Sequence, residues 1–410
     1  KAKLLYYLGD GTEVPEQSVA PQEIKILDPC MGSGHILVYA FEVLIEIYKE
    51  CGYSASAAAE QILRCNLYSL DIDQRSYELT CFALFMKARS YNADILAREI
   101  PLNLFSIQES NAIGENLLSF VADGDEEIKA DLQNLTASFQ NAKEYGSLIS
   151  IGSLHFDRIN RRVEEIRRQE CGDLFRLAFR EDTLKKLLPL IRQAQVMAGT
   201  YAVVATNPPY LYKMNKKLKN YVNHHYHEYA SDLFAVFLYR NFGFCKENGY
   251  CAFMSPFVWM FIKTYQKLRE YILQKKSISS LIQLEYSAFE EATVPICTFV
   301  LKNGPETKPG VYLRLSDFRG GMEVQKQKVI EAVKNPHCPY RYETPADRFT
   351  KIPGMPIAYW ANREYGDIFA DTPNIGAYAA VTNGLFTCDN QRFLRYWYEV
   401  PPEEIHFHCS

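Results

Sequence analysis

The strongest chemical signal in the sequence is the tetrad Asn207-Pro208-Pro209-Tyr210, which directly follows the apolar run 201–206. Two consecutive prolines fix the backbone and remove two N–H donors, so the segment offers carbonyl acceptors without competing donors. Asn207 adds a side-chain carbonyl and Tyr210 a flat ring. This set suits an amino group on an aromatic base, because two acceptors bind its hydrogens while the ring stacks on the base. A proline-rich turn with a packed tyrosine is the alternative.

An amino group conjugated to a purine is a poor nucleophile, because its lone pair is delocalised into the ring. Acceptors that pull on both hydrogens favour a pyramidal nitrogen as charge develops, which stabilises the transition state rather than the ground state. This chemistry requires neither a metal nor a covalent intermediate. His224, His225 and His227 are close in sequence, but their spacing is poor for one metal-binding helix face, and we assign no metal site.

A second candidate site is the segment 28–35, Asp-Pro-Cys-Met-Gly-Ser-Gly-His. Asp28 ends an apolar run, and Gly32 and Gly34 stand where a side chain would block a ligand. Such a turn brings backbone N–H groups and a helix N-terminus close to a bound molecule, which fits a nucleotide-like cofactor. Tight turns also need glycine for backbone reasons alone. The segment lacks the third glycine of the Rossmann motif and the Gly-Lys-Ser/Thr of the Walker motif. The sequence therefore does not predict that this turn binds phosphate groups.

Further polar residues follow the next two apolar runs. Asp71 lies near the end of run 67–72, where doubly wound cofactor folds place an acid that binds ribose hydroxyls. We predict Asp71 as the ribose ligand, with a solvated acid at a strand end as the alternative. Glu109 and Asn111 follow the third run and are candidates for binding the base of the cofactor.

Lysines follow the tetrad closely, at Lys213, Lys216, Lys217 and Lys219. Lysine side chains meet phosphates without reading sequence, so these residues are predicted to contact the backbone near a flipped nucleotide. A solvated lysine-rich loop is an equally simple interpretation.

Alternating strands and helices must position these residues. A buried strand, a glycine turn and a helix form the first unit, and the pattern repeats along the chain, which predicts an α/β fold with a parallel sheet covered on both faces. The expected strands are 24–28, 67–72, 103–108, 201–206, 250–254, 280–284 and 296–301. The expected helices are 36–49, 55–64, 74–88, 231–244 and 264–274.

Two stretches depart from this alternation. The charge-dense stretch of about 123–193 is predicted to be a helical insertion. Beyond residue 302 proline and glycine cluster and aromatic residues are dense, which predicts the start of a second, mixed domain. The expected division is therefore 1–302 and 303–410.

Composition bounds the remaining possibilities. The chain has 410 residues, 48% of them hydrophobic, enough for two or three domains with cores of their own. No apolar run approaches the roughly 20 residues of a membrane span, and no leader opens the chain, which favours a soluble cytoplasmic protein. Eleven cysteines without a CxxC pair favour reduced thiols over disulfides or zinc. The first residue is Lys1, so we expect a piece of a longer chain.

The order of segment 28–35, Asp71 and the tetrad resembles that of S-adenosylmethionine-dependent DNA methyltransferases that act on amino groups. The tetrad resembles the catalytic motif of adenine-N6 enzymes. The order of the motifs resembles the gamma class of these enzymes. More narrowly, Asp-Pro-x-Met-Gly-Ser-Gly-His and Gln-Glu-Ser-Asn at 108–111 resemble PglX-type methyltransferases of bacteriophage-exclusion (BREX) systems and related type IIG restriction-modification proteins. The same family is suggested by Asp389-Asn390-x-Arg392-Phe393 and Tyr398-Glu399-Val400. The resemblance covers most of the chain.

The resemblance implies a Rossmann-like class I methyltransferase sheet and transfer of a methyl group from S-adenosylmethionine to a flipped adenine of double-stranded DNA. Other defence-system subunits are candidate partners. The turn from Asp28 through Pro29, Gly32 and Gly34 would hold the methionine part of the cofactor. Asp71 would hold the ribose, and Glu109 or Asn111 the adenine region.

For the target base, the resemblance implies that Asn207, Pro208 and Tyr210 hold it. Phe289 resembles the aromatic residue that stacks on its other face, although a core phenylalanine fits the pattern nearly as well. Segment 231–234 is similar to segments that touch the cofactor. Aromatic residues after residue 302, among them Trp360, suit the beginning of a target-recognition domain.

One departure from the family is the region before Asp28. These enzymes carry a further cofactor-binding segment there, which the first 27 residues do not show clearly. We therefore expect weak cofactor binding and poor methylation by this chain alone. Two rival functions stay open: a methyltransferase acting on RNA bases or protein glutamine, and a non-catalytic DNA-binding subunit. No nuclease motif is visible in these residues.

Overall fold

The computed structural model describes residues 6–8, 19–169, 173–211, 213–286, 294–373, 375–380, 382 and 389–405. The chain divides into two compact units, Lys1–Asn362 and Arg363–Ser410. Two strands that follow residue 302 belong to the sheet of the first unit. The functional division at residue 302, with recognition of a target after it, stays a prediction.

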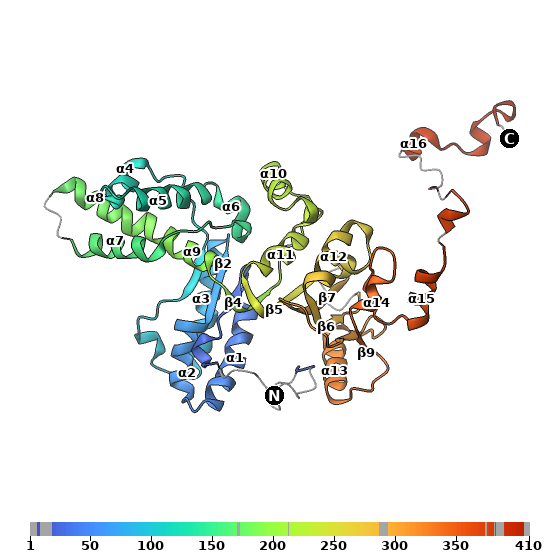
Figure 1. Ribbon diagram of the computed structural model, residues 1–410, viewed down its shortest axis with the longest axis horizontal. Helices are drawn as coiled ribbons and strands as arrows, with labels where there is room; N and C mark the ends of the chain where they lie inside the picture. The colour runs from blue at the N-terminus through green and yellow to red at the C-terminus, as the bar shows by residue number, and fades with distance from the viewer. Residues whose placement is uncertain are drawn as a thin grey trace. The chain divides into compact units, whose positions relative to one another are not determined.

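The first unit is built on a nine-stranded sheet in the order β3-β2-β1-β4-β5-β7-β6-β8-β9 (Figure 1). The strands are β1 (Ile26–Asp28), β2 (Leu67–Asp71), β3 (Asn103–Ser106), β4 (Tyr201–Thr206), β5 (Cys245–Pro256), β6 (Ser277–Gln283), β7 (Ile296–Lys302), β8 (Gly310–Arg314) and β9 (Arg341–Thr344). Strands β1 to β5 run parallel to one another.

Helices cover both faces of this sheet because successive side chains of a strand point to opposite sides. Ile26 of β1 lies in a buried cluster with α1 (His35–Glu50) and α3 (Gln74–Arg89). Leu27, its neighbour, lies in the other large cluster, on the face covered by α11 (Leu233–Phe242) and α12 (Gln266–Lys275). The predicted α/β fold with helices on both faces is confirmed.

Strands β7 and β9 run antiparallel to their neighbours, which differs from a purely parallel sheet. Strand β7 lies between β5 and β6, although it follows β6 in the chain. The connection from β6 to β7 contains no helix within the residues that the structure describes. A parallel return needs a long crossover, whereas an antiparallel neighbour needs only a short connection.

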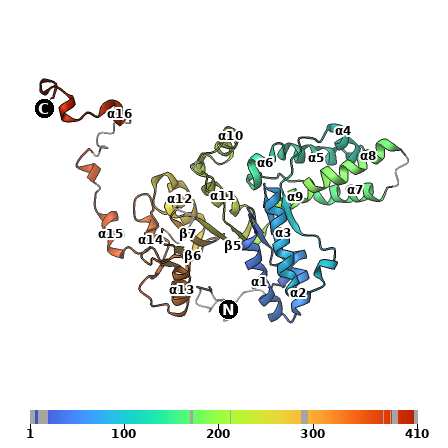
Figure 2. The ribbon, with the colours of Figure 1, turned by 180° about the vertical axis from the view of Figure 1, so that it is seen from behind.

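The helical insertion lies between β3 and β4. Its helices are α4 (Glu115–Ala122), α5 (Glu126–Ser138), α6 (Ala142–Tyr145), α7 (Phe156–Arg168), α8 (Leu174–Asp182) and α9 (Leu188–Ala198). Helix α2 (Ala55–Gln61) and helix α10 (Lys216–His225) lie outside it, the first beside α1 and the second after the tetrad (Figure 2). Within the described residues, the segment between β3 and β4 consists of helices joined by loops.

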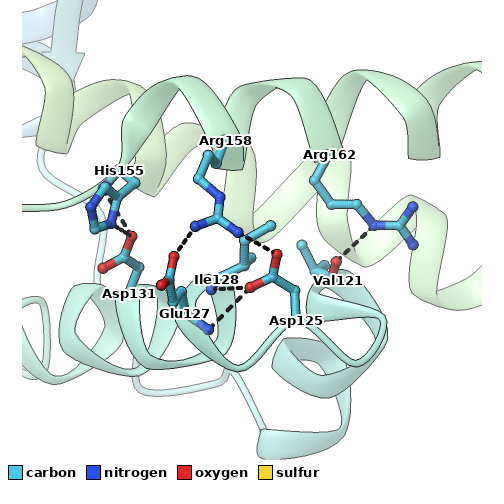
Figure 3. Close-up of polar contacts among 8 residues, drawn as sticks. All are labelled: Val121, Asp125, Glu127, Ile128, Asp131, His155, Arg158 and Arg162. Atoms are coloured by element: carbon cyan, nitrogen blue, oxygen red, sulfur yellow. Dashed lines mark hydrogen bonds and ion pairs between the residues drawn. The ribbon is translucent and has the colours of Figure 1, made fainter.

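Apolar side chains of α4, α5 and α7 belong to one buried cluster, and polar contacts join α7 to α4 and α5 at the surface. Arg158 of α7 pairs with Asp125, at 2.7 Å, and with Glu127 (Figure 3). The His155 ring lies 3.0 Å from Asp131. Arg162 donates to the carbonyl of Val121 at 2.9 Å. Such exposed pairs contribute roughly 0–1 kcal/mol each, so the packed apolar side dominates the stability of this region.

Helix α14 (Asp347–Thr350) still belongs to the first unit. The described residues of the second unit include the helices α15 (Arg363–Asp371) and α16 (Asn390–Phe393). Asp389 caps α16 by accepting the amide of Arg392 at 3.0 Å, which explains the local Asp-Asn-x-Arg pattern. Helix α13 (Gly321–Lys334) covers β8 in the first unit. No helix within the described residues is long and apolar enough to cross a membrane.

Candidate active site

The two chemical motifs follow neighbouring strands and lie at the same edge of the sheet, where the parallel strands end. Strand β1 lies between β2 and β4, and Leu27 of β1 pairs with Val204 of β4 in a parallel register. The glycine turn follows β1 and the tetrad follows β4, so both leave from carboxyl ends of neighbouring strands. The chain proceeds from β1 to β2 and β3 on one side and continues with β4 and β5 on the other. This reversal is the topological switch point, where open α/β sheets bind their ligands.

The glycine turn has a backbone that other residues rarely adopt. Gly32 has φ +50° and Gly34 has φ +81°. A Cβ atom on Gly34 would lie 2.8 Å from Cγ2 of Thr80, whereas a Cβ on Gly32 would meet nothing within 4 Å. Gly34 is therefore required for packing against α3, and Gly32 borders open space. The two glycines of the motif serve different physical purposes.

Side chains from β2 and α3 hold this turn in place. Asp71 accepts the amide of Gly32 at 2.9 Å and the amide of Asp73 at 2.9 Å. Thr80, fully buried on α3, donates to the carbonyl of Gly32 at 3.1 Å. A carboxylate has about four lone-pair sites, so Asp71 keeps capacity for a further donor. Its ribose role stays a prediction, while its support of the turn is a feature that the sequence pattern did not indicate.

Thr80 is a residue that sequence reasoning missed. Its signal in the sequence is faint, a single threonine in an otherwise amphipathic helix. Only the packing of α3 against the turn gives it a contact with Gly32.

Asp28 is buried at the end of β1, with 1% of its surface exposed. Burial raises the pKa of its carboxyl to about 7; the neighbouring Asp71 adds to the increase, while the amide of Cys30, 3.1 Å from Oδ1, opposes it. Thr206, at the end of β4, lies near enough to favour the charged form as well. Yet Oδ2 of Asp28 and Oγ1 of Thr206 are buried without a hydrogen-bond partner among the described residues. Such orphaned atoms are uncommon and favour a missing partner.

Glu109 and Asn111 contact the insertion. Glu109 accepts the backbone amide of Lys143 at 3.1 Å, and Asn111 accepts the amide of Asn141 at 2.9 Å. The two side chains are also 3.3 Å apart. They therefore fix the start of α6, and their predicted role with the cofactor base stays a prediction.

The tetrad is more exposed than the glycine turn. Asn207 and Pro209 are exposed, Tyr210 is half-buried and Pro208 is buried. The Tyr210 hydroxyl lies 2.7 Å from Oδ1 of Asn207 and 3.1 Å from the carbonyl of Met254. Burial raises the pKa of Tyr210, so the hydroxyl keeps its proton and acts as a donor. Since it has one proton, the shorter contact identifies Asn207 as its main acceptor.

This contact fixes the orientation of the Asn207 amide. A donor on Oδ1 identifies that atom as the carbonyl oxygen, because the amide nitrogen is not an acceptor. The oxygen has a second lone pair, which remains available for another N–H group. The Tyr210 ring lies edge-on to Phe234, with centroids 6.4 Å apart.

Asp232 anchors the chain after the tetrad. Its carboxylate accepts the amide of Leu211 at 3.2 Å and that of Phe234 at 3.3 Å. It thereby caps α11 and ties the residue after Tyr210 to that helix. Burial raises the pKa of Asp232, while these amides oppose the increase.

Of the predicted lysines, Lys213 precedes α10 and the others lie in its first turn. Lys213, Lys216 and Lys217 are exposed, and none forms an ion pair with another described residue. Asn215 caps the helix through the amide of Leu218 at 2.9 Å. Phe289 lies outside the described residues.

Two other features are separate from this edge. A cavity of about 430 Å³ lies where the strands begin, lined by residues that include Lys25, Tyr68 and Arg192, and it contains no predicted site residue. Within the described part of the chain, no cluster of His, Cys, Asp and Glu side chains is arranged to hold a metal ion.

The family was settled by comparison with known proteins. A model of the Eco57I restriction-modification methylase family matches residues 65–289, more than half of the 410 residues. The chain belongs to this family. In this Eco57I-type methylase, the matched range includes Asp71, the helical insertion and the tetrad, whereas the glycine turn precedes it.

Curated relatives of the Eco57I-type chain are longer. The adenine-specific methyltransferase PglX of Lacticaseibacillus casei (strain Zhang) is 36% identical over 94% of this chain and 32% of its own length. The adenine-specific methyltransferase BrxX of Escherichia coli O9:H4 (strain HS) is 33% identical over 98% of this chain and 35% of its own length. The chain thus spans about a third of these relatives. The expected resemblance to PglX-type proteins is confirmed.

Among solved structures, the methyltransferase subunit of a type I restriction-modification system from Streptococcus thermophilus is similar, with 12% identity and a TM-score of 0.44. The match covers 82% of this chain and 53% of that subunit.

Proposed function

We propose that this chain is the catalytic part of a site-specific DNA adenine-N6 methyltransferase that uses S-adenosylmethionine and serves phage defence or restriction-modification. The observation that carries the proposal is that the glycine turn and the Asn-Pro-Pro-Tyr tetrad follow the neighbouring strands β1 and β4 at the switch point of the sheet. Membership of a restriction-modification methylase family and the relatives named adenine-specific methyltransferases support it.

The residues around the glycine turn suit this cofactor. The ammonium group of S-adenosylmethionine needs an acidic partner. Asp28 has a buried carboxylate oxygen without a hydrogen-bond partner among the described residues. The ribose hydroxyls of the cofactor need acceptors, and Asp71 has lone pairs beyond its two amide contacts. Gly32 borders space that a side chain would fill. When bound, S-adenosylmethionine would supply an electrophilic methyl group on a positively charged sulfur.

The tetrad would act on the target base. The Asn207 side-chain oxygen and the Pro208 backbone carbonyl would accept the two hydrogens of the exocyclic amine. This pull grows stronger as positive charge develops on the nitrogen, so it lowers the barrier rather than merely binding the base. Tyr210 would orient the Asn207 amide through its hydroxyl and offer its ring to the base.

A base in a duplex must leave the stack to reach these groups. The exposed Asn207 and Pro209 make the tetrad accessible to such a base. The exposed Lys213, Lys216 and Lys217 nearby would neutralise phosphates of double-stranded DNA. Other subunits of a defence system are proposed as further partners.

Incubation with methyl-labelled S-adenosylmethionine tests the proposal directly. DNA, RNA and protein from the host are offered separately, and the labelled product is digested to identify the modified residue. Label on N6 of adenine in DNA is the expected result. Label confined to RNA or to protein glutamine would overturn the choice of substrate, and DNA binding without any label would favour a non-catalytic subunit.

A further inference from the structure

A short segment of the helical insertion lies between the two halves of the proposed site. Residues 141–149, called the bridge below, comprise α6 and the turn Gly146–Leu148. From Gly146 to Ile149 the bridge is buried. The rest of the insertion packs mainly on itself and on one face of the sheet. The bridge alternates its contacts between the cofactor side and the target side.

On the cofactor side, the bridge contacts three places predicted to hold the cofactor. The amide of Asn141 donates to Asn111 at 2.9 Å, and the amide of Lys143 donates to Glu109 at 3.1 Å. The buried Ser147 hydroxyl donates to the carbonyl of Pro29, within the glycine turn, at 2.7 Å.

On the target side, the bridge contacts α10, the helix that follows the tetrad. Asn215, the cap of α10, donates to Glu144 at 2.8 Å. The Tyr145 and Tyr221 rings stack with centroids 4.2 Å apart and an interplanar angle of 18°. Near the end of the bridge, the buried Tyr226 hydroxyl donates to the carbonyl of Leu148 at 2.7 Å.

A third anchor ties the bridge to α11. Arg240, almost fully buried, donates to the carbonyl of Ile149 at 2.9 Å. Leu148 itself packs in an apolar cluster with Leu218 and Val222 of α10. Buried hydrogen bonds and close packing leave the bridge little freedom to move. A displacement of the target side, called the target wall, is therefore transmitted to the cofactor side, called the cofactor wall, and the reverse.

We propose that the bridge is a positioning element that fixes α10 relative to the glycine turn, with Ser147 and Tyr226 as positioning residues. This inference rests on the proposed function, because it assigns the two walls to cofactor and target. It gives the insertion a role beyond filling space between β3 and β4. Loss of a contact on the target wall should loosen the cofactor wall, and the reverse.

Four single substitutions test the bridge. Ser147→Ala removes the contact with Pro29, and Tyr226→Phe removes the contact with Leu148 from the opposite wall. Ser138→Ala is the matched control for the first, because the half-buried Ser138 hydroxyl donates within α5, to the carbonyl of Asn134. Tyr239→Phe is the matched control for the second, because Tyr239 lies nearby on α11 and contacts neighbouring rings.

The first readout is amide hydrogen exchange of residues 28–36 without cofactor. We expect about three- to tenfold faster exchange in Ser147→Ala and Tyr226→Phe, as loss of one buried hydrogen bond implies, and less than twofold change in both controls. The second readout is the dissociation constant for S-adenosylmethionine by calorimetry, with about three- to tenfold weakening expected for the same two variants.

The two readouts separate failure of the bridge from failure of the proposed function. If Tyr226→Phe leaves both exchange and cofactor affinity as in the unsubstituted chain, the bridge is refuted while the proposed function stands. If exchange changes as expected but no form of the chain binds S-adenosylmethionine, the mechanical link is supported and the assignment of the walls is refuted.

Discussion

The glycine turn and the tetrad lie on neighbouring strands but are held very differently. The turn is fixed by the buried Thr80, by Asp71 and by Ser147, which come from three separate parts of the chain. In the tetrad, Asn207 is exposed and is oriented by one contact, from Tyr210. A seat for a small cofactor benefits from being preformed, whereas groups that receive a base extracted from a duplex must stay accessible. The following predictions test this contrast.

Asn207→Ala should have the largest effect on activity. Removing an acceptor that acts in the transition state lowers the methylation rate by about 100-fold or more. Cofactor affinity should change less than twofold, because Asn207 belongs to the target side. Methyl transfer to DNA and calorimetric titration measure the two quantities.

The exposed Asn220 on α10 provides the matched control, since Asn220→Ala changes the same residue type outside the tetrad. Equal methylation by the Asn207→Ala variant and the unsubstituted chain would refute the assigned role.

Asp28→Asn, on the cofactor side, should remove one contribution to the pH dependence of the free energy of unfolding. The pKa of Asp28 is raised by burial from 3.8 to about 7, so the folded state holds a proton that the unfolded state releases. This contribution is complete below pH 4 and is lost as the pH rises through about 7. The shift corresponds to a difference on the order of 4 kcal/mol in the free energy of unfolding.

Denaturant unfolding of both proteins at several pH values between 4 and 8 measures this slope. Asp94→Asn, at an exposed position, is the control and should leave the slope unchanged. A slope that persists in Asp28→Asn would mean that another group titrates.

Gly34→Ala should destabilise the turn more than Gly52→Ala does. Both glycines have a left-handed backbone, φ +81° and +87°, which costs roughly 1–2 kcal/mol for alanine. Only at position 34 does the new Cβ collide with Thr80. The difference between the two losses in unfolding free energy therefore isolates the collision, and equal losses would contradict the packing of α3 on the turn.

Replacing Lys216 and Lys217 together by glutamine should have the smallest effect. Each lysine that neutralises a phosphate contributes about one unit to the slope of log affinity against log salt. DNA binding should weaken modestly, without loss of sequence preference.

The matched control replaces Lys185 and Lys186, which already pair with Glu181 and Asp182 at 2.9 Å each. Fluorescence anisotropy at several salt concentrations measures the slopes. An unchanged slope in the Lys216 and Lys217 variant would assign these lysines to a solvated surface.

Local features of the site were predictable from sequence because they depend on few neighbouring residues. The apolar runs placed β1, β2, β3 and β4 within a few residues of their observed bounds. Gly32 and Gly34 indicated a tight turn after β1, and the structure gives both a positive φ. Two prolines after an apolar run indicated a rigid segment at a strand end, where the tetrad lies.

The sequence alone determined the first four strands, the turn and the tetrad, since strand and turn preferences act over a handful of residues. Only the tertiary structure decided that β1 and β4 are neighbours, that Asp71 and Thr80 hold the turn, and that Ser147 reaches Pro29. Ser147 and Pro29 are 118 positions apart in the sequence. Contacts over such separations depend on how the whole chain packs, which no local pattern specifies.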